Sequence, residues 1–348
     1  MSNRPASEMA GLTGLRGIAA ITVFIAHGRF YEMVPSLRPF LIFFEWHSLA
    51  VDLFFMLSGF VLVHVYSARF DAGVDRFWGP YFMARIARVV PLYLATLAAC
   101  LGIFGAGSLV LGKWPAHVTW DVVATNLALL QNWPGLFHIS LNIPSWSLSV
   151  EVFCYILVMP VALLMHRLLR RGSTILILIA LLLAWRAVVP SIDSNWIGLL
   201  RGITGFLAGA LLHKLHLANN DRIVIATTLT SAALFLILQS LVAWGGYASF
   251  LPVITFPFLI HGLGSSARSI VHDFFRSPIM LWLGDISYST YLWHGPVYLG
   301  AHAVVRPKLM SMPAYVRVIW IIFEFTLILW ISHLSYYRFE LPLRRRLR

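Results

Sequence analysis

Long apolar segments, each close to the length of one bilayer crossing, follow one another along almost the whole chain. A transmembrane helix needs about 20 predominantly apolar residues. The sequence predicts about ten such helices, near residues 12–29, 48–66, 84–105, 145–166, 174–190, 196–213, 222–243, 249–264, 279–304 and 315–337. The longest connection, residues 106–144, contains three tryptophans, which favour an interfacial loop or a short amphipathic helix. We therefore predict an all-α integral membrane protein whose residues 1–348 form one membrane domain.

The composition excludes the other classes of protein. Hydrophobic residues make up 59% of the 348 residues and charged residues 11%. A soluble domain has roughly 45–50% hydrophobic residues and about 25% charged residues. A soluble globule with so few charges could not cover its surface, and a disordered chain would need low hydrophobicity. The net charge of +12 has a simpler source than nucleic-acid binding, because cytoplasmic loops of membrane proteins collect Lys and Arg. We expect no nucleic-acid partner.

The basic residues orient the predicted helices. With the N-terminus in the cytoplasm, eighteen of them fall on the cytoplasmic side and six on the other, which predicts that both termini are cytoplasmic. The cytoplasmic set is Arg4, Arg16, Arg69, Arg76, Arg85, Arg88, Arg167, Arg170, Arg171, Lys214, Arg222, Arg268, Arg276, Arg338, Arg344, Arg345, Arg346 and Arg348. The opposite set is Arg29, Arg38, Lys113, Arg306, Lys308 and Arg317, while Arg186 and Arg201 lie within or at the ends of helices.

Two ionisable residues share one face of the first predicted helix. Arg16 and His27 are eleven residues apart, which turns them to within about 20° of each other and separates them by about 16 Å along the axis. Arg16 near the cytoplasmic face therefore places His27 around or beyond the bilayer midplane. A lone intramembrane His is often a packing residue. The aligned Arg favours a functional role, because ionisable groups inside spans are costly and by default mark function.

Glu151 is a candidate partner for His27. It lies in the fourth predicted helix, one turn beyond Ser147 on the same face, at a depth that His27 approaches from the other side. A buried carboxylate needs a partner, and a carboxylate beside a His makes an oriented base that can take a proton from a hydroxyl. A helix-bundle ion pair is the alternative interpretation. Asp52 in the second predicted helix is a competing partner for His27.

Arg85 and Arg88 lie on one face at the cytoplasmic start of the third predicted helix, because they are three residues apart. One interpretation is positive-inside anchoring of the helix. The other is binding of a phosphate-bearing ligand from the cytoplasm.

A polar stripe marks the ninth predicted helix. Ser287, Tyr291 and His294 recur at helical spacing, and Tyr288 flanks them. Such a stripe faces other protein or a cavity, so packing and substrate binding both remain open. Glu324 lies in the middle of the last predicted span, and the sequence assigns it no role.

Common metal and nucleotide motifs are missing from the sequence. No His, Cys or Asp spacing is typical of a zinc site, and there is no Walker loop, dinucleotide-binding Gly-rich turn or G-x-S-x-G elbow. We therefore expect no metal.

Five segments now stand in order along the chain. Arg16, ten residues and His27 come first, followed by Val51–Phe60, by Arg85–Tyr93, by Trp146–Glu151 and by Ile286–His294. Together they resemble the signature stretches of the acyltransferase 3 family of membrane-bound O-acyltransferases. The resemblance covers residues 14 to 294, and its ordered set of motifs is more specific than any one of them.

The resemblance implies acyl transfer from a cytoplasmic acyl-coenzyme A, with acetyl-coenzyme A as the expected donor, to a hydroxyl of a sugar, glycan or small molecule. Catalytic roles are then expected for His27 as the base and for Glu151 and Asp52, and donor binding for Arg16, Arg85 and Arg88. Contact with the acceptor is expected for Trp146, Ser147, Ser149, Ser287, Tyr288, Tyr291 and His294.

The expected acceptor is an extracytoplasmic or lipid-linked saccharide at a bacterial cytoplasmic (inner) membrane, with membrane lipid and glycan-assembly proteins as partners. Some family members carry an extracytoplasmic hydrolase-like domain. We expect none here, because the sequence ends at Arg348, so the protein would act alone or hand acyl groups to a partner. Two alternatives are acylation of a cytoplasmic small molecule such as a macrolide-like scaffold, and a non-enzymatic transporter or flippase.

Overall fold

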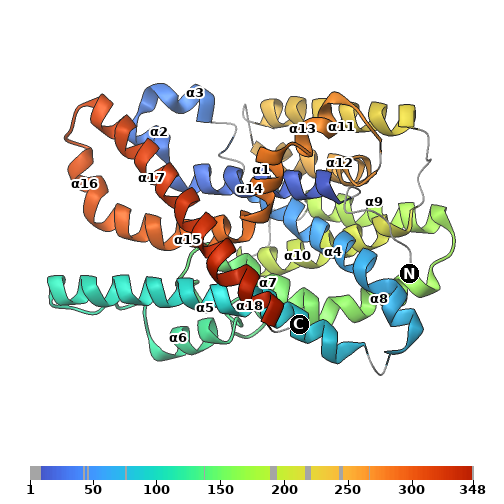
Figure 1. The fold of residues 1–348 in the computed structure, drawn as a ribbon, viewed down its shortest axis with the longest axis horizontal. Helices are drawn as coiled ribbons and strands as arrows, with labels where there is room; N and C mark the ends of the chain where they lie inside the picture. The colour runs from blue at the N-terminus through green and yellow to red at the C-terminus, as the bar shows by residue number, and fades with distance from the viewer. Residues whose placement is uncertain are drawn as a thin grey trace. The chain divides into compact units, whose positions relative to one another are not determined.

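The computed structural model describes residues 9–41, 44, 47–74, 77–136, 138–188, 194–215, 221–242, 246–265 and 267–346. Every regular element within these residues is a helix (Figure 1), as the sequence predicts. Arg4, Arg76, Arg348 and the predicted span ends at 189–190 and 243 lie outside the described residues, as does the side chain of Arg186.

Within the described residues, seven helices are long and apolar enough to cross a membrane. They are Ala10–Met33, Ser48–Ala72, Trp78–Leu111, Ser145–Leu168, Trp196–Lys214, Asp221–Leu238 and Ala314–Arg346. Two shorter apolar helices, Gly172–Trp185 and Leu251–Leu263, coincide with the two shortest predicted spans. The structure therefore supports a helical membrane protein, while the count of ten and the cytoplasmic position of both termini stay predictions.

The predicted span 279–304 is divided into several elements. Helix α14 (Pro278–Asp285) and helix α15 (Ser287–Gly300) are separated at Ile286, and the π-helical turn η6 (Ala301–Val305) follows α15. Neither α14 nor α15 alone reaches the length of about 20 residues that one crossing needs, although α15, η6 and α16 (Arg306–Leu309) follow one another without a break. The stripe predicted from the sequence lies on α15.

Each π-helical turn ends two residues before a proline. Turn η4 (Cys154–Val158) joins α7 (Ser145–Phe153) to α8 (Met159–Leu168), η6 precedes α16 (Arg306–Leu309), and η7 (Tyr336–Glu340) precedes α18 (Leu341–Arg346). Proline has no N–H to give to the preceding turn and crowds it. The wider turn accommodates the proline and lets the helix continue.

The predicted connection 106–144 contains helical structure. Helix α5 (Trp78–Leu111) extends past its predicted end, and the short helix α6 (Trp120–Leu127) begins at a tryptophan that is 89% exposed. A hydrogen bond with the Thr119 side chain lowers the pKa of the Asp121 carboxyl in the first turn of α6. Both features suit a short helix at the membrane–water interface.

The chain divides into two compact units, each described by itself. The first comprises Met1–Ala19, Trp46–Phe77 and Phe153–Asp285. At its centre α4 (His47–Ala72) packs on α10 (Ser194–Lys214). Gly59 faces the Phe206 carbonyl and Gly209 the Met56 carbonyl, with no room for a Cβ at either position, which is how small residues let membrane helices approach closely. The unit also holds α9 (Gly172–Val188), α11 (Asp221–Val242), η5 (Gly246–Thr255), α12 (Phe256–Leu263) and α13 (Ile270–Phe275).

The second unit comprises Ala20–Glu45, Trp78–Val152 and Ile286–Arg348. In it α15 packs against α5 and α17 (Ala314–Ser335), and the end of α1 (Ala10–Gly28) leads into α2 (Phe30–Met33), η1 (Pro35–Leu37) and α3 (Arg38–Leu41). The core of this unit consists of Phe24, Phe30, Met33, Val34, Tyr298, Leu309 and Ile328.

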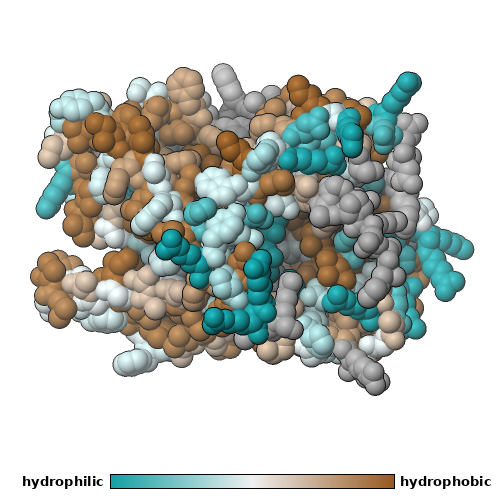
Figure 2. Space-filling model, in the orientation of Figure 1, coloured by the Kyte–Doolittle hydropathy of each residue, from teal (hydrophilic) through white to brown (hydrophobic). Residues whose placement is uncertain are grey.

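Apolar side chains are widely exposed on α5 and α17. Leu109 and Val110 at the end of α5 are 88% and 84% exposed, and Ile319 and Ile322 on α17 are also exposed. Figure 2 shows apolar side chains over the visible face of α5, and hydrophilic side chains near the C-terminal end at α18. Exposed apolar faces of this kind suit contact with lipid.

Candidate functional site

Two histidine rings stack in the second unit. The rings of His27 on α1 and His294 on α15 lie 5.1 Å apart between centroids, with 26° between their planes. Tyr298, one turn beyond His294, donates a hydrogen bond of 3.0 Å to the Phe24 carbonyl on α1. Phe325 of α17 packs on the Phe24 ring at 4.8 Å. These contacts fix the two helices at the depth where the histidines meet.

Hydrogen bonds within each helix define the tautomers of both rings. Nδ1 of His27 lies 3.0 Å from the Val23 carbonyl, and Nδ1 of His294 lies 3.1 Å from the Thr290 carbonyl. A carbonyl oxygen only accepts, so each Nδ1 must carry the proton. In the neutral rings the lone pair is then on Nε2. Nε2 of His27 is the atom that can act as a general base.

Polar contacts extend from His294 to helix α7. The Tyr291 ring lies edge-on to His294 at 5.9 Å, and the Tyr291 hydroxyl is 2.6 Å from the Ser147 hydroxyl. The Tyr291 hydroxyl also donates to the Pro144 carbonyl over 3.1 Å. The structure thus brings together four of the residues predicted from the sequence: His27, Ser147, Tyr291 and His294.

A buried asparagine holds α15 in place. Asn142 donates through Nδ2 to the Thr96 hydroxyl at 3.1 Å and to the Leu292 carbonyl at 3.2 Å. Its Oδ1 occupies the space where a side chain at position 295 would begin, so only Gly295 fits there. Sequence reasoning missed Asn142, because a single Asn in a long connection shows no periodicity.

Ser149 and Tyr288 are engaged with the backbone. The Ser149 hydroxyl donates to the Leu129 carbonyl at 2.8 Å and accepts from the Asn132 amide at 3.1 Å. The Tyr288 hydroxyl donates to the Val89 carbonyl on α5 at 2.7 Å. These contacts position the connection before α7 and the start of α15. Ser287 is buried at that start, whereas Trp146 and Glu151 are half-buried on α7.

Asp52 and Arg16 belong to the first unit. Asp52 forms a buried ion pair of 2.9 Å with Arg201, which also donates to the Ser48 carbonyl. Arg16 is half-buried on α1 between Gly14 and Gly17, which lie against α13 and α14. The sequence predicts Asp52 as a partner of His27, and the structure gives it a strong partner within its own unit. Its catalytic role stays a prediction.

Positive charge gathers at one end of the second unit. Arg88 on α5 lies within electrostatic range of Arg344 on α18. Arg344 donates to Glu340 at 2.7 Å, and Glu340 in turn accepts a hydrogen bond from Ser289 on α15. Arg85 lies one turn before Arg88 on the same helix. Sequence analysis read Arg344 only as an orientation signal, and its proximity to Arg88 depends on the packing of α18 against α5.

The stripe on α15 continues beyond the predicted residues. The ring centroids of Tyr298 and His294 lie 5.8 Å apart, and the His302 ring stacks on the Tyr298 ring with 5.6 Å between centroids. Arg306 then donates to His302 Nε2 at 2.7 Å and to Glu32 at 3.2 Å. The spacing of four residues could have revealed this continuation. Among the described residues, no group of three or more His, Cys, Asp or Glu side chains could hold a metal ion.

The family of the chain follows from a match over nearly its whole length. The acyltransferase domain family (Acyl_transf_3) matches residues 9–337. The chain belongs to the acyltransferase 3 family. The match includes the paired histidines and the polar contacts around them, whereas Glu340 and Arg344 lie beyond its end.

Several curated relatives are similar to this family member. Acyltransferase MdmB of Streptomyces mycarofaciens is 38% identical over 171 residues, which cover 47% of this chain and 41% of the relative. Protein 2 in picA locus of Rhizobium radiobacter is 35% identical over 44% of this chain and 81% of the relative. O-acetyltransferase OatA of Staphylococcus aureus is 24% identical over 97% of this chain and 57% of the relative. The chain thus spans only part of MdmB and OatA, and no solved structure gives a significant match.

Proposed function

We propose that this acyltransferase 3 protein is a membrane O-acyltransferase. It moves an acetyl group from cytoplasmic acetyl-coenzyme A to a hydroxyl of an extracytoplasmic or lipid-linked saccharide, at the cytoplasmic membrane of a bacterium. Family membership supports acyl transfer, and the relative named O-acetyltransferase supports an acetyl group and an oxygen acceptor. The observation that carries the proposal is the stacked pair of His27 and His294, in which the Nδ1 proton of His27 is held by the Val23 carbonyl.

His27 serves as the general base. Its Nε2 takes the proton of the acceptor hydroxyl while the oxygen attacks the thioester carbonyl carbon. The carbon–sulfur bond then breaks, and the coenzyme A thiolate leaves and recovers the proton from His27. Glu151, in the same unit, is the carboxylate that we propose to orient and stabilise the His27 imidazolium, and the catalytic role of Asp52 stays the alternative predicted from the sequence.

The basic end of the second unit binds the donor. Arg85 and Arg88 meet the phosphates of coenzyme A, because guanidinium groups bind phosphate through charge-assisted hydrogen bonds. Arg344 also lies close to Arg88, but its ion pair with Glu340 offsets its charge, so donor binding at this end is assigned to Arg85 and Arg88. Arg16 supports the donor on the cytoplasmic part of α1.

The acceptor meets the polar network beside the histidines. Ser147 and Tyr291 are expected to contact it, together with Trp146 and Ser287. Ser149 and Tyr288 bind backbone carbonyls, so we expect them to position the acceptor site rather than to contact the acceptor.

Two measurements test this function. Membranes that contain the protein are incubated with radiolabelled acetyl-coenzyme A, and the label is followed into saccharide and lipid fractions. In parallel, coenzyme A is expected to raise the melting temperature of the purified protein, because a ligand of the native state stabilises it. Arg88→Ala should raise the coenzyme A concentration needed for this stabilisation by about 10- to 100-fold, because a hydrogen bond to a charged group contributes a free energy of that order.

The control removes a positive charge elsewhere in the same unit. Lys308→Ala changes an exposed residue of α16 and should leave the stabilisation by coenzyme A unchanged. No label in any fraction, together with no stabilisation at millimolar coenzyme A, would refute the enzyme and favour a transporter.

A further inference from the structure

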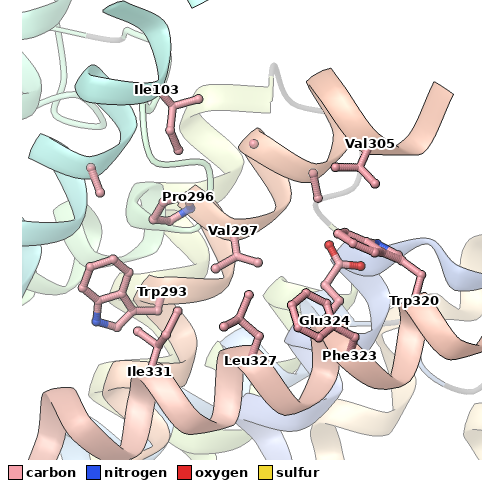
Figure 3. Close-up of a pocket in the computed structure, with 13 residues that line it drawn as sticks. Ile103, Trp293, Pro296, Val297, Val305, Trp320, Phe323, Glu324, Leu327 and Ile331 are labelled. Atoms are coloured by element: carbon pink, nitrogen blue, oxygen red, sulfur yellow. The ribbon is translucent and has the colours of Figure 1, made fainter. Parts of the chain in front are cut away.

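An apolar groove of about 390 Å³ runs between α5, α15 and α17 of the second unit. Its volume falls in the range of about 300–1,000 Å³ that is usual for small-molecule sites. Ile103 of α5, Trp293 and Val297 of α15, and Phe323 and Leu327 of α17 line its walls (Figure 3). The outer face of α17 beside it exposes apolar side chains. The groove is therefore placed for entry of an apolar molecule from the hydrocarbon core of the membrane.

One carboxyl group lies in this apolar lining. Glu324 is only 3% exposed, although it sits in the middle of α17. Figure 3 shows its carboxylate pointing from α17 into the space between Trp320, Val297 and Val305. The Trp320 side chain hydrogen-bonds the carboxyl group, but Oε1 has no hydrogen-bond partner among the residues that the structure describes. Ionisable groups inside a membrane span are costly and by default mark a functional site.

The chemistry of the groove selects its occupant. A buried carboxyl oxygen without a partner is costly, so a ligand that supplies a hydrogen-bond donor gains more than one that does not. An unsubstituted acyl chain would fill the groove and contact its walls, but it would leave Glu324 Oε1 without a hydrogen bond. A free sugar would bury most of its hydroxyls against apolar side chains. An apolar molecule that carries a hydroxyl can pack against the apolar walls and donate a hydrogen bond to the carboxyl.

The groove lies one layer of side chains away from the paired histidines. Phe325, which follows Glu324, packs on Phe24 of α1, and Phe24 precedes His27 by one turn. Tyr298 lies between the two regions, since it contacts both Phe24 and His294. A molecule held in the groove is thus anchored close to the proposed base.

We propose that this groove binds the apolar part of the acyl acceptor, a hydroxyl-bearing amphiphile that enters from the membrane, and that Glu324 hydrogen-bonds one of its hydroxyls. The acceptor role rests on the proposed function, whereas binding in the groove rests only on the lining and on Glu324. The substrate class is therefore a lipid-like alcohol rather than a water-soluble saccharide.

Photolabelling of the full chain in lipid vesicles tests the binding. The probes are a 14-carbon alcohol with a mid-chain diazirine and the matched probe that ends in a methyl group, both without any acyl donor. We expect the alcohol to label peptides that contain residues 293–305 and 320–331 about tenfold more than the methyl probe, from the usual strength of a hydrogen bond to a charged group. Glu324→Leu should remove this preference, and Glu324→Gln should keep part of it.

Gly300 provides a variant that does not touch Glu324. A Cβ at this groove-lining position would meet only Ile103 Cδ1, at 3.9 Å. Gly300→Leu should therefore fill the groove without a clash and abolish labelling by both probes. Gly105→Leu on α5, where nothing lies within 4 Å of an added Cβ, is the matched control and should label as wild type does.

Equal labelling by the two probes, or labelling that survives in Gly300→Leu, would overturn the proposed site. Acetyl transfer tests the acceptor role separately: Gly300→Leu should lower it at least tenfold, and unchanged transfer would overturn that role. Labelling needs no acyl donor, so a loss of labelling tests the groove, and a loss of acyl transfer with labelling kept tests the proposed function.

Discussion

The imidazole of His27 takes its reactive tautomer from a carbonyl of its own helix. Nδ1 of His27 donates to the Val23 carbonyl four residues earlier, so the ring is oriented before any substrate binds. His294 uses the same device on α15 and stacks its ring on His27. Because the ring is already held in place, it can present Nε2 to the acceptor hydroxyl with little loss of side-chain freedom when the substrate binds.

The ion pair of Asp52 and Arg201 is expected to stabilise the first unit. Its side chain and that of Arg201 are 3% and 10% exposed, and removal of one partner of a buried pair costs about 3–5 kcal/mol. Asp52→Leu and Arg201→Met should each lower the free energy of unfolding by an amount of this order. The double variant should recover most of the loss, because apolar residues can replace a buried ion pair.

Acetyl transfer by the double variant separates the two roles of Asp52. We expect transfer to be kept, which leaves Glu151 as the carboxylate that orients His27. A double variant that regains stability and still fails to transfer would show that Asp52 acts in catalysis.

The sequence could assign candidate residues to helix faces, but it could not predict which of them contact one another. Helical spacing was enough to place Tyr291 and His294 on one face of α15, and this is confirmed by their contact. The stacking of His294 on His27 joins positions 267 residues apart in the sequence, and no local pattern encodes it. The position of Glu324 in the lining of the groove could not be predicted from the sequence either, because it depends on how α5, α15 and α17 pack.

At the scale of elements, α15 is the part on which the site depends most. It carries Tyr291, His294 and Tyr298, and Pro296 interrupts its backbone hydrogen bonds. Asn142 compensates by bonding the Leu292 carbonyl from outside the helix. Close approach of Asn142 is possible only because Gly295 has no side chain.

Gly295→Ala tests this arrangement. The added Cβ would lie 3.0 Å from Asn142 Cγ and from Pro144 Cδ, and closer still to Asn142 Oδ1. Asn142 cannot move without losing its own hydrogen bonds, so we expect a loss of about 1–3 kcal/mol in stability and reduced acetyl transfer through displacement of His294. Thermal unfolding and label transfer are measured on the same preparation.

Gly107→Ala on α5 is the matched control, since nothing lies within 4 Å of its added Cβ. It should be neutral or stabilising by up to about 1 kcal/mol, because Gly inside a helix is unfavourable. Equal effects of the two substitutions would contradict the role given to Asn142.

The elements themselves were largely readable from the sequence. Apolar runs predicted α1, α4, α10, α11 and α17 to within a few residues, apart from the extension of α4 to Ala72. The runs could not predict the break between α14 and α15, because apolar residues continue through it. Nor could they predict π-helical turns, which arise from the local effect of single prolines.

At the scale of the whole molecule, the excess of positive charge and the apolar composition have a common explanation. Exposed apolar faces on α5 and α17 suit lipid, and much of the charge lies near helix ends. A small part of that charge serves chemistry in our proposal: Arg16, Arg85 and Arg88. The arrangement of charges along the chain therefore carries more information than the net value of +12.

Acetyl transfer by His27→Ala tests whether His27 is the general base. Removal of a general base should lower the rate of label transfer from acetyl-coenzyme A by about 10²- to 10⁴-fold, while coenzyme A still raises the melting temperature of the variant. His117→Ala, which removes an exposed histidine from the connection after α5, should transfer label at the wild-type rate. If His27→Ala transfers label at the wild-type rate, His27 is not the base.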